Sequence, residues 1–263
     1  MQIQGSTVLL TGATGGLGHA IARSLAARGA TLILTGRRSE VLESLAAELG
    51  ARALAIDLSD HGDVERLSDE AGATDILVAN AALPASGPLD SFSVAEIDRA
   101  LEVNLRAPIV LAHALAPAMI SRGRGHLLFM SSLSGKAATR GTALYNASKY
   151  GLRGFASALR ADLRSSGVGV SAVFPGFIRD AGMFADSHVK LPPGIGTRSP
   201  EDVARAVLVA IERNRGEIDV APLPLRASTM LAGVAPELAA NVARRLGSDD
   251  ITRKMHAAQR EKR

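Results

Sequence analysis

Short apolar runs rich in Leu, Ile and Val alternate along the chain with longer stretches in which apolar residues recur every three or four positions. The short runs are typical of buried strands, and the longer stretches are typical of amphipathic helices. Strands are predicted at residues 7–11, 31–35, 53–57, 76–79, 126–130, 168–174 and 217–220. Helices are predicted at 16–28, 40–49, 94–120, 142–165 and 200–214, with Ser39 and Ser199 as capping residues.

This alternation of strand and helix predicts an α/β fold with a doubly wound parallel sheet. Parallel strands joined by helices make right-handed crossovers, which place helices on both faces of the sheet. The chain has 263 residues, 47% of them hydrophobic, and this suffices for one large core. We therefore expect a single-domain, Rossmann-like sheet of about seven strands, with ligands bound at the carboxyl ends of the strands.

The segment after residue 221 departs from this rhythm. Pro222 and Pro224 end the pattern, an Ala/Leu-rich stretch follows as far as Leu246, and a polar run closes the chain. We expect residues 1–221 to form the Rossmann-like domain and 222–263 a helical extension whose last dozen residues fray. The Ala/Leu-rich stretch is predicted to pack over the ligand side of the sheet or to contact another subunit. Contact with a membrane surface is the less favoured interpretation.

Composition narrows the classes of partner and site. The 30 Lys and Arg residues stand against 26 Asp and Glu, largely interleaved, and aromatic residues make up only 3%, which disfavours nucleic acid as a partner. The chain has no Cys, and its six His residues lack the spacing of metal ligands, so no metal is expected. The first residues do not resemble a secretion signal, and charges interrupt every apolar run that would be long enough to cross a bilayer. A soluble cytoplasmic protein is therefore expected.

A glycine-rich turn, TGATGGLG, joins the first predicted strand to the first predicted helix. Glycines at positions 12, 16 and 18 permit a tight turn and a close approach of the backbone to a pyrophosphate. The helix N-terminus then presents unpaired N–H groups to that anion. This position between strand and helix predicts a dinucleotide-binding loop formed by Gly12, Thr14, Gly15, Gly16, Leu17 and Gly18.

The second strand ends in Leu-Thr-Gly-Arg-Arg, with no acidic residue where sheets that prefer NAD place one. The guanidinium of Arg37 or Arg38 can pair with a 2′-phosphate, so NADP(H) is the expected cofactor and NAD(H) is less favoured. The alternative is a pair of solvated arginines at a helix start, a position that the helix dipole slightly disfavours.

Ser132 follows the fifth strand, and Tyr145 and Lys149 lie four residues apart in the next helix. This spacing puts the phenol and the ammonium on one helix face. A free tyrosine has a pKa of about 10, and a fixed cation beside Tyr145 is expected to lower that pKa. Ser132 would then hold a substrate oxygen while Tyr145 exchanges the proton. Taken alone, a Tyr-x-x-x-Lys pattern is more often packing plus a surface charge.

Together, the motifs TGATGGLG, AIDLSD, VANAA, YNASK and PGFI, with Asn104 and Ser132, resemble the classical short-chain dehydrogenase/reductase family over roughly residues 7–182. The resemblance implies a catalytic set of Asn104, Ser132, Tyr145 and Lys149, with Asn104 holding Lys149 through a water and Lys149 also binding the nicotinamide ribose. It further implies cofactor contacts from Asp57, Leu58, Asn80, Ala81, Pro175, Gly176 and Ile178.

Two positions depart from the family pattern. The usual Asn-Asn-Ala-Gly segment reads Ala79, Asn80, Ala81, Ala82 here, a change that we expect the fold to tolerate. Asp180 stands where many members have a Thr that binds the nicotinamide carboxamide. Either this acid accepts a hydrogen bond from that amide, or the lid enters the site differently.

The resemblance implies an oxidoreductase that moves a hydride between nicotinamide and the carbonyl or alcohol carbon of a small molecule. It also implies a homo-oligomer that pairs through the helices beginning near Val94 and Thr142. Two alternatives are a non-catalytic NADP(H)-binding regulator and an epimerase or dehydratase of the related extended fold. The long loop at 175–200 has the composition of a substrate lid, and the substrate pocket is predicted to be apolar and formed by Leu83, Leu133, Phe177, Met183 and Phe184.

Overall fold

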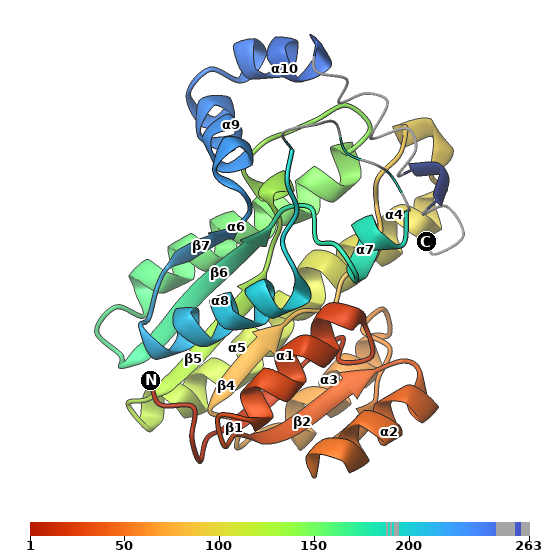
Figure 1. Ribbon diagram of the computed structural model, residues 1–263. Coiled ribbons are helices and arrows are strands. Elements are labelled where there is room, and N and C mark those ends of the chain that lie inside the picture. The colour runs from red at the N-terminus through yellow and green to blue at the C-terminus, as the bar shows by residue number, and fades with distance from the viewer. Residues whose placement is uncertain (188, 190, 192–194, 246–255, 259–263) are drawn as a thin grey trace.

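The computed structural model describes residues 1–187, 189, 191, 195–245 and 256–258. Its centre is one parallel sheet with the strand order β3-β2-β1-β4-β5-β6-β7 (Figure 1). The strands are β1 (Thr7–Leu10), β2 (Thr31–Gly36), β3 (Arg52–Ala55), β4 (Ile76–Ala79), β5 (Gly125–Met130), β6 (Val168–Pro175) and β7 (Glu217–Val220). The seven predicted strands and the Rossmann-like fold class are confirmed. The strand order reverses between β1 and β4, where such sheets bind their ligands.

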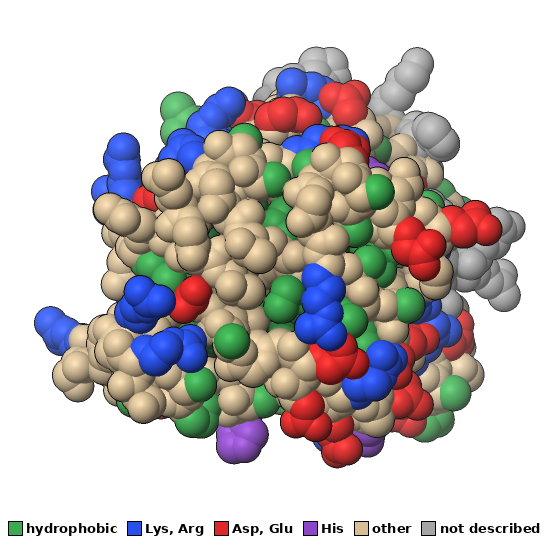
Figure 2. Space-filling view, turned by 90° about the horizontal axis from the view of Figure 1, so that it is seen from below, with side chains coloured by type: hydrophobic (Ala, Val, Ile, Leu, Met, Phe, Trp, Pro, Cys, Tyr) green, Lys and Arg blue, Asp and Glu red, His purple; other side chains and the backbone are tan. Residues whose placement is uncertain are grey.

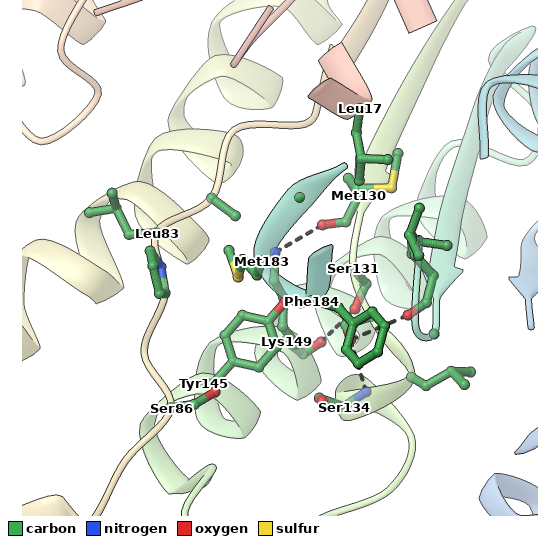
Figure 3. Close-up of a pocket in the computed structure, with 18 of the residues that line it drawn as sticks. Leu17, Leu83, Ser86, Met130, Ser131, Ser134, Tyr145, Lys149, Met183 and Phe184 are labelled. Atoms are coloured by element: carbon green, nitrogen blue, oxygen red, sulfur yellow. Dashed lines mark hydrogen bonds between the residues drawn. The ribbon is translucent and has the colours of Figure 1, made fainter. Parts of the chain in front are cut away.

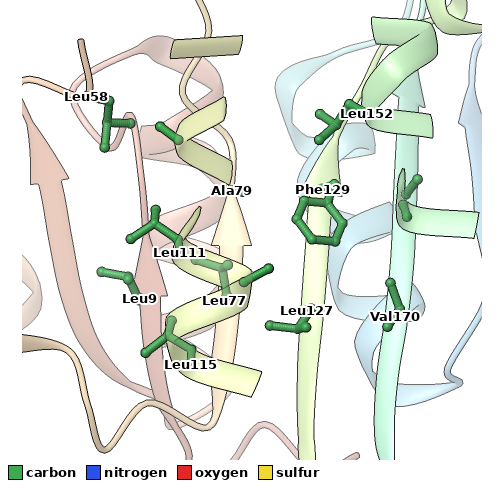
Figure 4. Close-up of a cluster of buried hydrophobic side chains, with 14 of the residues drawn as sticks. Leu9, Leu58, Leu77, Ala79, Leu111, Leu115, Leu127, Phe129, Leu152 and Val170 are labelled. Carbon is green, nitrogen blue, oxygen red and sulfur yellow. The ribbon is translucent and has the colours of Figure 1, made fainter. Parts of the chain in front are cut away.

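Helices cover both faces of the sheet because alternate strand residues point to opposite sides. Leu9 packs with Leu111, Leu115 and Phe129 in the core on one face, which Figure 4 shows. Val8 and Leu10 belong to the core on the other face. The helices of the first face are α3 (His61–Glu70), α4 (Val94–Leu101), α5 (Ala107–Ser121) and α6 (Ala143–Asp162); those of the second are α1 (Gly16–Ala26), α2 (Ser39–Leu49) and α8 (Pro200–Glu212).

Helix α3 was not predicted from the sequence, and the predicted third strand is two residues too long at its end. The Ile56 N–H still bonds to Gly36 across the sheet, but the Asp57 N–H donates to the Asp63 carboxylate at 2.7 Å and turns the chain into α3. Asp60 caps this helix by accepting from the Asp63 N–H. The helix buries only Val64 and Leu67, so its apolar periodicity is weak.

The predicted helix at 94–120 is interrupted by a π-helical turn, η2 (Glu102–Arg106), between α4 and α5. The whole run, Val94–Ser121, is the one helix among the described residues with the length and composition to cross a membrane. Half of its most apolar window is buried inside the fold, where α5 packs against β5. The run is therefore a core helix that packs against the sheet.

The capping predictions have different outcomes. Ser199 caps α8 as expected, because its hydroxyl accepts from the Asp202 N–H while the Asp202 carboxylate accepts from the Ser199 N–H. The prediction for Ser39 is wrong. Ser39 is already the first residue of α2, and Arg38 occupies the cap position without a side-chain hydrogen bond.

Beyond β7 the chain forms two helices, α9 (Leu223–Val234) and α10 (Pro236–Arg245). Figure 1 shows both helices beyond the carboxyl end of β7, on the side of the molecule where the cavity described below opens. The predicted helix pair is thus present, and its first helix begins at Leu223. The predicted fraying of the last dozen residues falls mostly outside the described residues. On the surface shown in Figure 2, Lys and Arg side chains lie beside Asp and Glu.

Candidate active site

A cavity of about 1140 Å³ lies at the carboxyl ends of the strands. It runs from the glycine-rich turn after β1, past the ends of β2 to β6, to the inner side of α9 and α10. Every residue predicted for the cofactor, catalytic and substrate sites lines it, with the exception of Asn104. The fold therefore brings together predicted site residues that are up to 172 positions apart in the chain, from Gly12 to Phe184.

The glycine-rich turn forms a cradle that side chains would fill. Gly12 has a φ of +67°, and a Cβ there would lie 2.7 Å from the Cα of Ala81. A Cβ on Gly16 would lie 2.5 Å from the Cβ of Ala181. The N-terminus of α1 has no side-chain cap and no acidic residue in its first turn. Its N–H groups and positive dipole end therefore suit an anion such as a pyrophosphate.

Both arginines after β2 line the same cavity. Arg38 donates to the backbone carbonyl of Thr14, which ties it to the glycine-rich turn. Asp57 faces them from the end of β3. Partial burial alone would raise the pKa of Asp57, but hydrogen bonds from Ser59 and the charges of Arg37 and Arg99 hold it below its usual value. Arg37 and Arg38 line this end of the cavity together with one carboxylate, that of Asp57, so the lining carries an excess of positive charge.

Asn80 and Ala81 join the end of β4 to the glycine-rich turn. The Asn80 amide donates to the carbonyls of Thr11 and Gly12 at 3.0 and 3.2 Å. The Thr11 hydroxyl in turn accepts from the backbone N–H groups of Asn80 and Ala81. These bonds use Asn80 and the Ala81 backbone, and none uses the positions of the family's first Asn or its Gly, which is consistent with the expected tolerance of Ala79 and Ala82.

Tyr145, Lys149 and Ser132 meet at the middle of the cavity. Figure 3 shows Tyr145 and Lys149 projecting from α6 toward the same space, with Met183 and Phe184 beside them. The Lys149 ammonium lies 5.7 Å from the centroid of the Tyr145 ring and donates to the Met130 carbonyl at 3.0 Å. The predicted placement of the phenol and the ammonium on one helix face is therefore found in the structure.

The predicted lowering of the Tyr145 pKa is wrong for this structure. Tyr145 is half-buried at the cavity wall, and burial raises the pKa of its hydroxyl to about 12, although a hydrogen bond with Ser132 acts in the opposite direction. Burial also lowers the pKa of Lys149 to about 8. Burial is the largest cause of both pKa shifts, because desolvation disfavours the charged form of each group.

Asn104 lies in the π-helical turn η2 and is completely buried. Its amide donates to the Leu83 carbonyl at 2.9 Å, and its carbonyl oxygen accepts from the Leu83 N–H at 2.7 Å. These two bonds anchor the loop after β4. Asn104 bonds to Leu83 and the Lys149 ammonium to Met130, with no direct hydrogen bond between these two described residues, so a water-mediated link between them is a proposal.

The loop after β6 carries the residues expected near the nicotinamide. The Pro175 carbonyl lies 3.4 Å from the Ser132 hydroxyl, and the Gly176 N–H donates to Val220. Asp180 has a φ of +67°, its side chain is 71% exposed, and its carboxylate lies 3.3 Å from the Arg179 guanidinium. Asp180 does not line the cavity, so its side chain does not take the place of the family's Thr.

The five apolar pocket residues predicted from the sequence all line the cavity. Phe177 and Phe184 pack ring to ring, with centroids 4.9 Å apart. Sequence reasoning missed a second group of lining residues, which lie outside the motifs on loops, on α6 directly after Lys149 and on α9: Ser86, Thr139, Tyr150, Ile195, Leu225, Ser228, Thr229 and Ala232. The recurrence of apolar residues along α9 was the sequence signal that could have identified the residues on that helix. Among the described residues no cluster of His, Asp or Glu is arranged for a metal ion.

Comparison with known proteins identifies the family. The model of the short chain dehydrogenase family matches residues 6–190. The ketoacyl reductase HetN of Nostoc sp. is 34% identical over 235 residues, which cover 86% of this chain and 82% of HetN. A short-chain dehydrogenase from Sphingobium yanoikuyae in complex with NADPH has a TM-score of 0.78 at 29% identity, covering 89% of this chain and 94% of that one.

A second solved structure has the same arrangement. The bulky-bulky ketone specific alcohol dehydrogenase from Comamonas testosteroni has a TM-score of 0.76 at 25% identity, and the match covers 89% of this chain and 93% of that one. The family match spans more than half of the chain and includes the glycine-rich turn, Ser132, Tyr145 and Lys149. The chain therefore belongs to the short-chain dehydrogenase/reductase family of nicotinamide-dependent oxidoreductases.

Proposed function

We propose that this protein is an NADP(H)-dependent oxidoreductase that interconverts a carbonyl and a secondary alcohol on a small, mainly apolar substrate. The observation that carries this proposal is the convergence of an anion cradle, two arginines and the Ser132, Tyr145 and Lys149 side chains in one cavity. Its relatives include a ketoacyl reductase and a ketone-specific alcohol dehydrogenase, which supports carbonyl chemistry.

The residues of the cavity fit a dinucleotide phosphate. Gly12 and Gly16 leave room for the pyrophosphate at the start of α1, and Arg37 and Arg38 would bind the 2′-phosphate. Asp57 and Leu58 would contact the adenine side. Lys149 would hold the nicotinamide ribose, and the nicotinamide itself would lie against Asn80, Ala81, Pro175, Gly176 and Ile178. When bound, the nicotinamide supplies or accepts the hydride.

The protein's own residues handle the proton. With a pKa near 12 in this structure, Tyr145 carries its proton at neutral pH and can donate it to the oxygen of a substrate carbonyl. The Ser132 hydroxyl would hold that oxygen, and the Lys149 ammonium would stabilise the phenolate left behind. Asn104 would act indirectly, by holding the Leu83 loop and relaying protons to solvent through water.

Cofactor binding is the first test. NADPH and NADH are titrated into the wild type, Arg37→Asp and Arg38→Asp, following cofactor fluorescence. Loss of one bidentate guanidinium–phosphate pair is expected to weaken NADPH binding at least tenfold while NADH binding is kept or improved. Arg213→Asp, an exposed position beyond α8, makes the same change in charge and should leave both affinities unchanged. Equal affinity of the wild type for NADH and NADPH would contradict the proposed cofactor.

Catalysis is the second test. A panel of apolar ketones is offered with NADPH to the wild type and to Tyr145→Phe, which keeps the ring and removes the hydroxyl. We expect the rate to fall by roughly 100-fold or more, the usual contribution of a general acid, with NADPH affinity retained. Tight NADPH binding without turnover of any carbonyl would favour the alternative function, a non-catalytic NADP(H)-binding regulator.

A further inference from the structure

Helix α9 presents one face to the cavity and the opposite face to solvent. Leu225, Ser228, Thr229 and Ala232 line the cavity, at the spacing of one helix face. On the other side, Met230 is 75% and Val234 88% exposed. Pro236, Glu237 and Ala239 extend the lining from α10. The C-terminal extension is therefore part of the pocket rather than an appendage.

Two contacts anchor α9 beside the predicted catalytic residues. Leu225 packs over the loop after β6, because a Cβ on Gly176 would lie 3.0 Å from a methyl of Leu225 and 3.1 Å from a methyl of Leu133. Arg226 lies 4.0 Å from the Asp219 carboxylate at the end of β7. The inner face of α9 thus begins next to Leu133, the residue that follows Ser132.

Besides Leu225 and Leu231, the wall that α9 presents is made of small residues. Ser228 and Thr229 keep their hydroxyls within the helix by donating to the carbonyls of Leu225 and Arg226, so their hydrogen-bond donors are already satisfied. Ala232 continues the same face. Helix α7 (Gly182–Ala185) supplies Met183 and Phe184, which also line the cavity. Apart from those two leucines, the cavity therefore has small side chains on α9, and it has large apolar ones on α7.

We propose that this part of the cavity is a channel for an extended apolar arm of the substrate, and that Ser228, Thr229 and Ala232 set how long or bulky that arm can be. The inference rests on the proposed carbonyl chemistry and adds the substrate class, a ketone with one long alkyl arm. The cavity exceeds the roughly 300–1000 Å³ typical of ligand pockets, which is consistent with a cofactor plus an extended substrate.

The test uses a homologous series of methyl ketones, from 2-butanone to 2-undecanone, with NADPH and the full chain. In the wild type, kcat/KM should rise by up to roughly fourfold for each added methylene that enters the channel. Ala232→Phe should abolish this rise, so that kcat/KM no longer increases from 2-butanone to 2-undecanone. Ala232→Leu should shorten the accepted arm and covers the case in which the larger residue impairs folding.

Ala227→Phe is the matched control, since Ala227 is exposed on the same helix and does not line the cavity. It should retain the wild-type dependence on chain length. The inference is overturned if both Ala232 variants retain that dependence, or if the wild type shows none. If the wild type binds NADPH but reduces no ketone, the proposed function fails; binding of 2-undecanone to the NADPH complex, measured with and without Ala232→Phe, then still decides whether the channel exists.

Discussion

The atoms around each glycine decide whether that glycine can be replaced by alanine. Gly16 and Gly154 both lie in helices and both have ordinary φ values, but their surroundings differ. A Cβ on Gly16 would lie 2.5 Å from the Cβ of Ala181, well inside the 3.5–4.0 Å of a normal carbon contact, whereas a Cβ on Gly154 would meet nothing within 4 Å. The same substitution should therefore have opposite consequences at the two sites.

We expect Gly16→Ala to weaken NADPH binding at least tenfold, because the loop that carries Ala181 must move away from α1 by about 1 Å. A displacement of this size can cost roughly 100-fold in rate at a site of positioned groups. Gly154→Ala should leave cofactor binding unchanged and stabilise the protein by about 0.5–1 kcal/mol, because alanine is the better helix former. NADPH titration and urea unfolding of both variants measure these effects. Unchanged NADPH affinity in Gly16→Ala would show that the loop yields freely.

His126 makes stability depend on pH. It is buried on β5 with its Nε2 2.9 Å from the Ser171 hydroxyl, and burial lowers its pKa to about 3, with smaller contributions from the N-terminal ammonium and Arg160. The unfolded chain binds this proton below the usual pKa of about 6.5, whereas the folded protein does not. Stability from neutral His126 is therefore complete above pH 6.5 and is lost as the pH falls toward 3.

Between pH 7 and pH 5 this one group should cost about 2 kcal/mol of unfolding free energy. Urea unfolding at the two pH values is compared for wild type and His126→Gln, whose loss over the same interval should be smaller by about that amount. His113→Gln removes an exposed histidine from α5 and should lose as much as the wild type. Identical losses in all three proteins would mean that His126 does not titrate differently on folding.

The residues that the sequence located are those that the chemistry requires by type and spacing. A proton donor and a cation four positions apart in a helix, and glycines between strand and helix, can be read without coordinates. The direction of the Tyr145 pKa could not, because it depends on how much water the folded pocket excludes. Nor could the two bonds between Asn104 and Leu83, which join residues 21 positions apart.

At the scale of elements, an ionic cluster ties the loop after β5 to the edge of the sheet. The Lys136 ammonium lies 2.6 Å from Asp219 and 2.8 Å from Glu217, both on β7, and 4.0 Å from the centroid of the Phe174 ring. Arg153 on α6 pairs with Glu217 as well. The cluster therefore connects the segment that follows Ser132 with α6, β6 and β7.

Lys136→Met should destabilise the protein by about 2–3 kcal/mol, somewhat less than the loss of a fully buried pair, because Asp219 is left poorly hydrated without its ammonium. The measurement is the urea midpoint at pH 7. Arg205→Met removes an exposed partner of Asp202 and should cost less than about 1 kcal/mol. If Lys136→Met is as stable as Arg205→Met, the cluster contributes no more to stability than a solvated surface ion pair.

The elements that sequence periodicity missed have little apolar signal of their own. Helix α3 buries two large residues, and its start depends on the Asp60 cap. The π-helical turn that places Asn104 lies inside a continuous helical pattern, and one extra residue per turn does not disturb that pattern enough to be seen. Strong periodicity predicted the strands and the long helices. The positions at which these elements are interrupted depend instead on local hydrogen bonds.

At the scale of the whole molecule, most of the large apolar side chains that are exposed among the described residues lie in two regions, with Ile120 at the end of α5 outside both. One includes Val94 at the start of α4, 74% exposed, and Tyr150 on α6, 40% exposed. The other is the outer face of α9 and α10, with Met230 and Val234. Helices α4 and α6 pack against each other, so their exposed residues belong to one side of the fold.

We propose that the protein is a homo-oligomer that pairs through the α4 and α6 side, as the family resemblance implies. An isologous interface places the same residues of both copies against each other, so one charge introduced per chain acts twice. Val94→Asp combined with Tyr150→Asp should therefore shift the species seen by sedimentation velocity toward the monomer. Met230→Asp combined with Val234→Asp carries the same charge on α9 and should leave the assembly intact. If only the α9 variant dissociates, the exposed outer face of α9 and α10 is the interface. The inner face of α9 would then form a substrate wall in each subunit, directly behind the contact between the subunits.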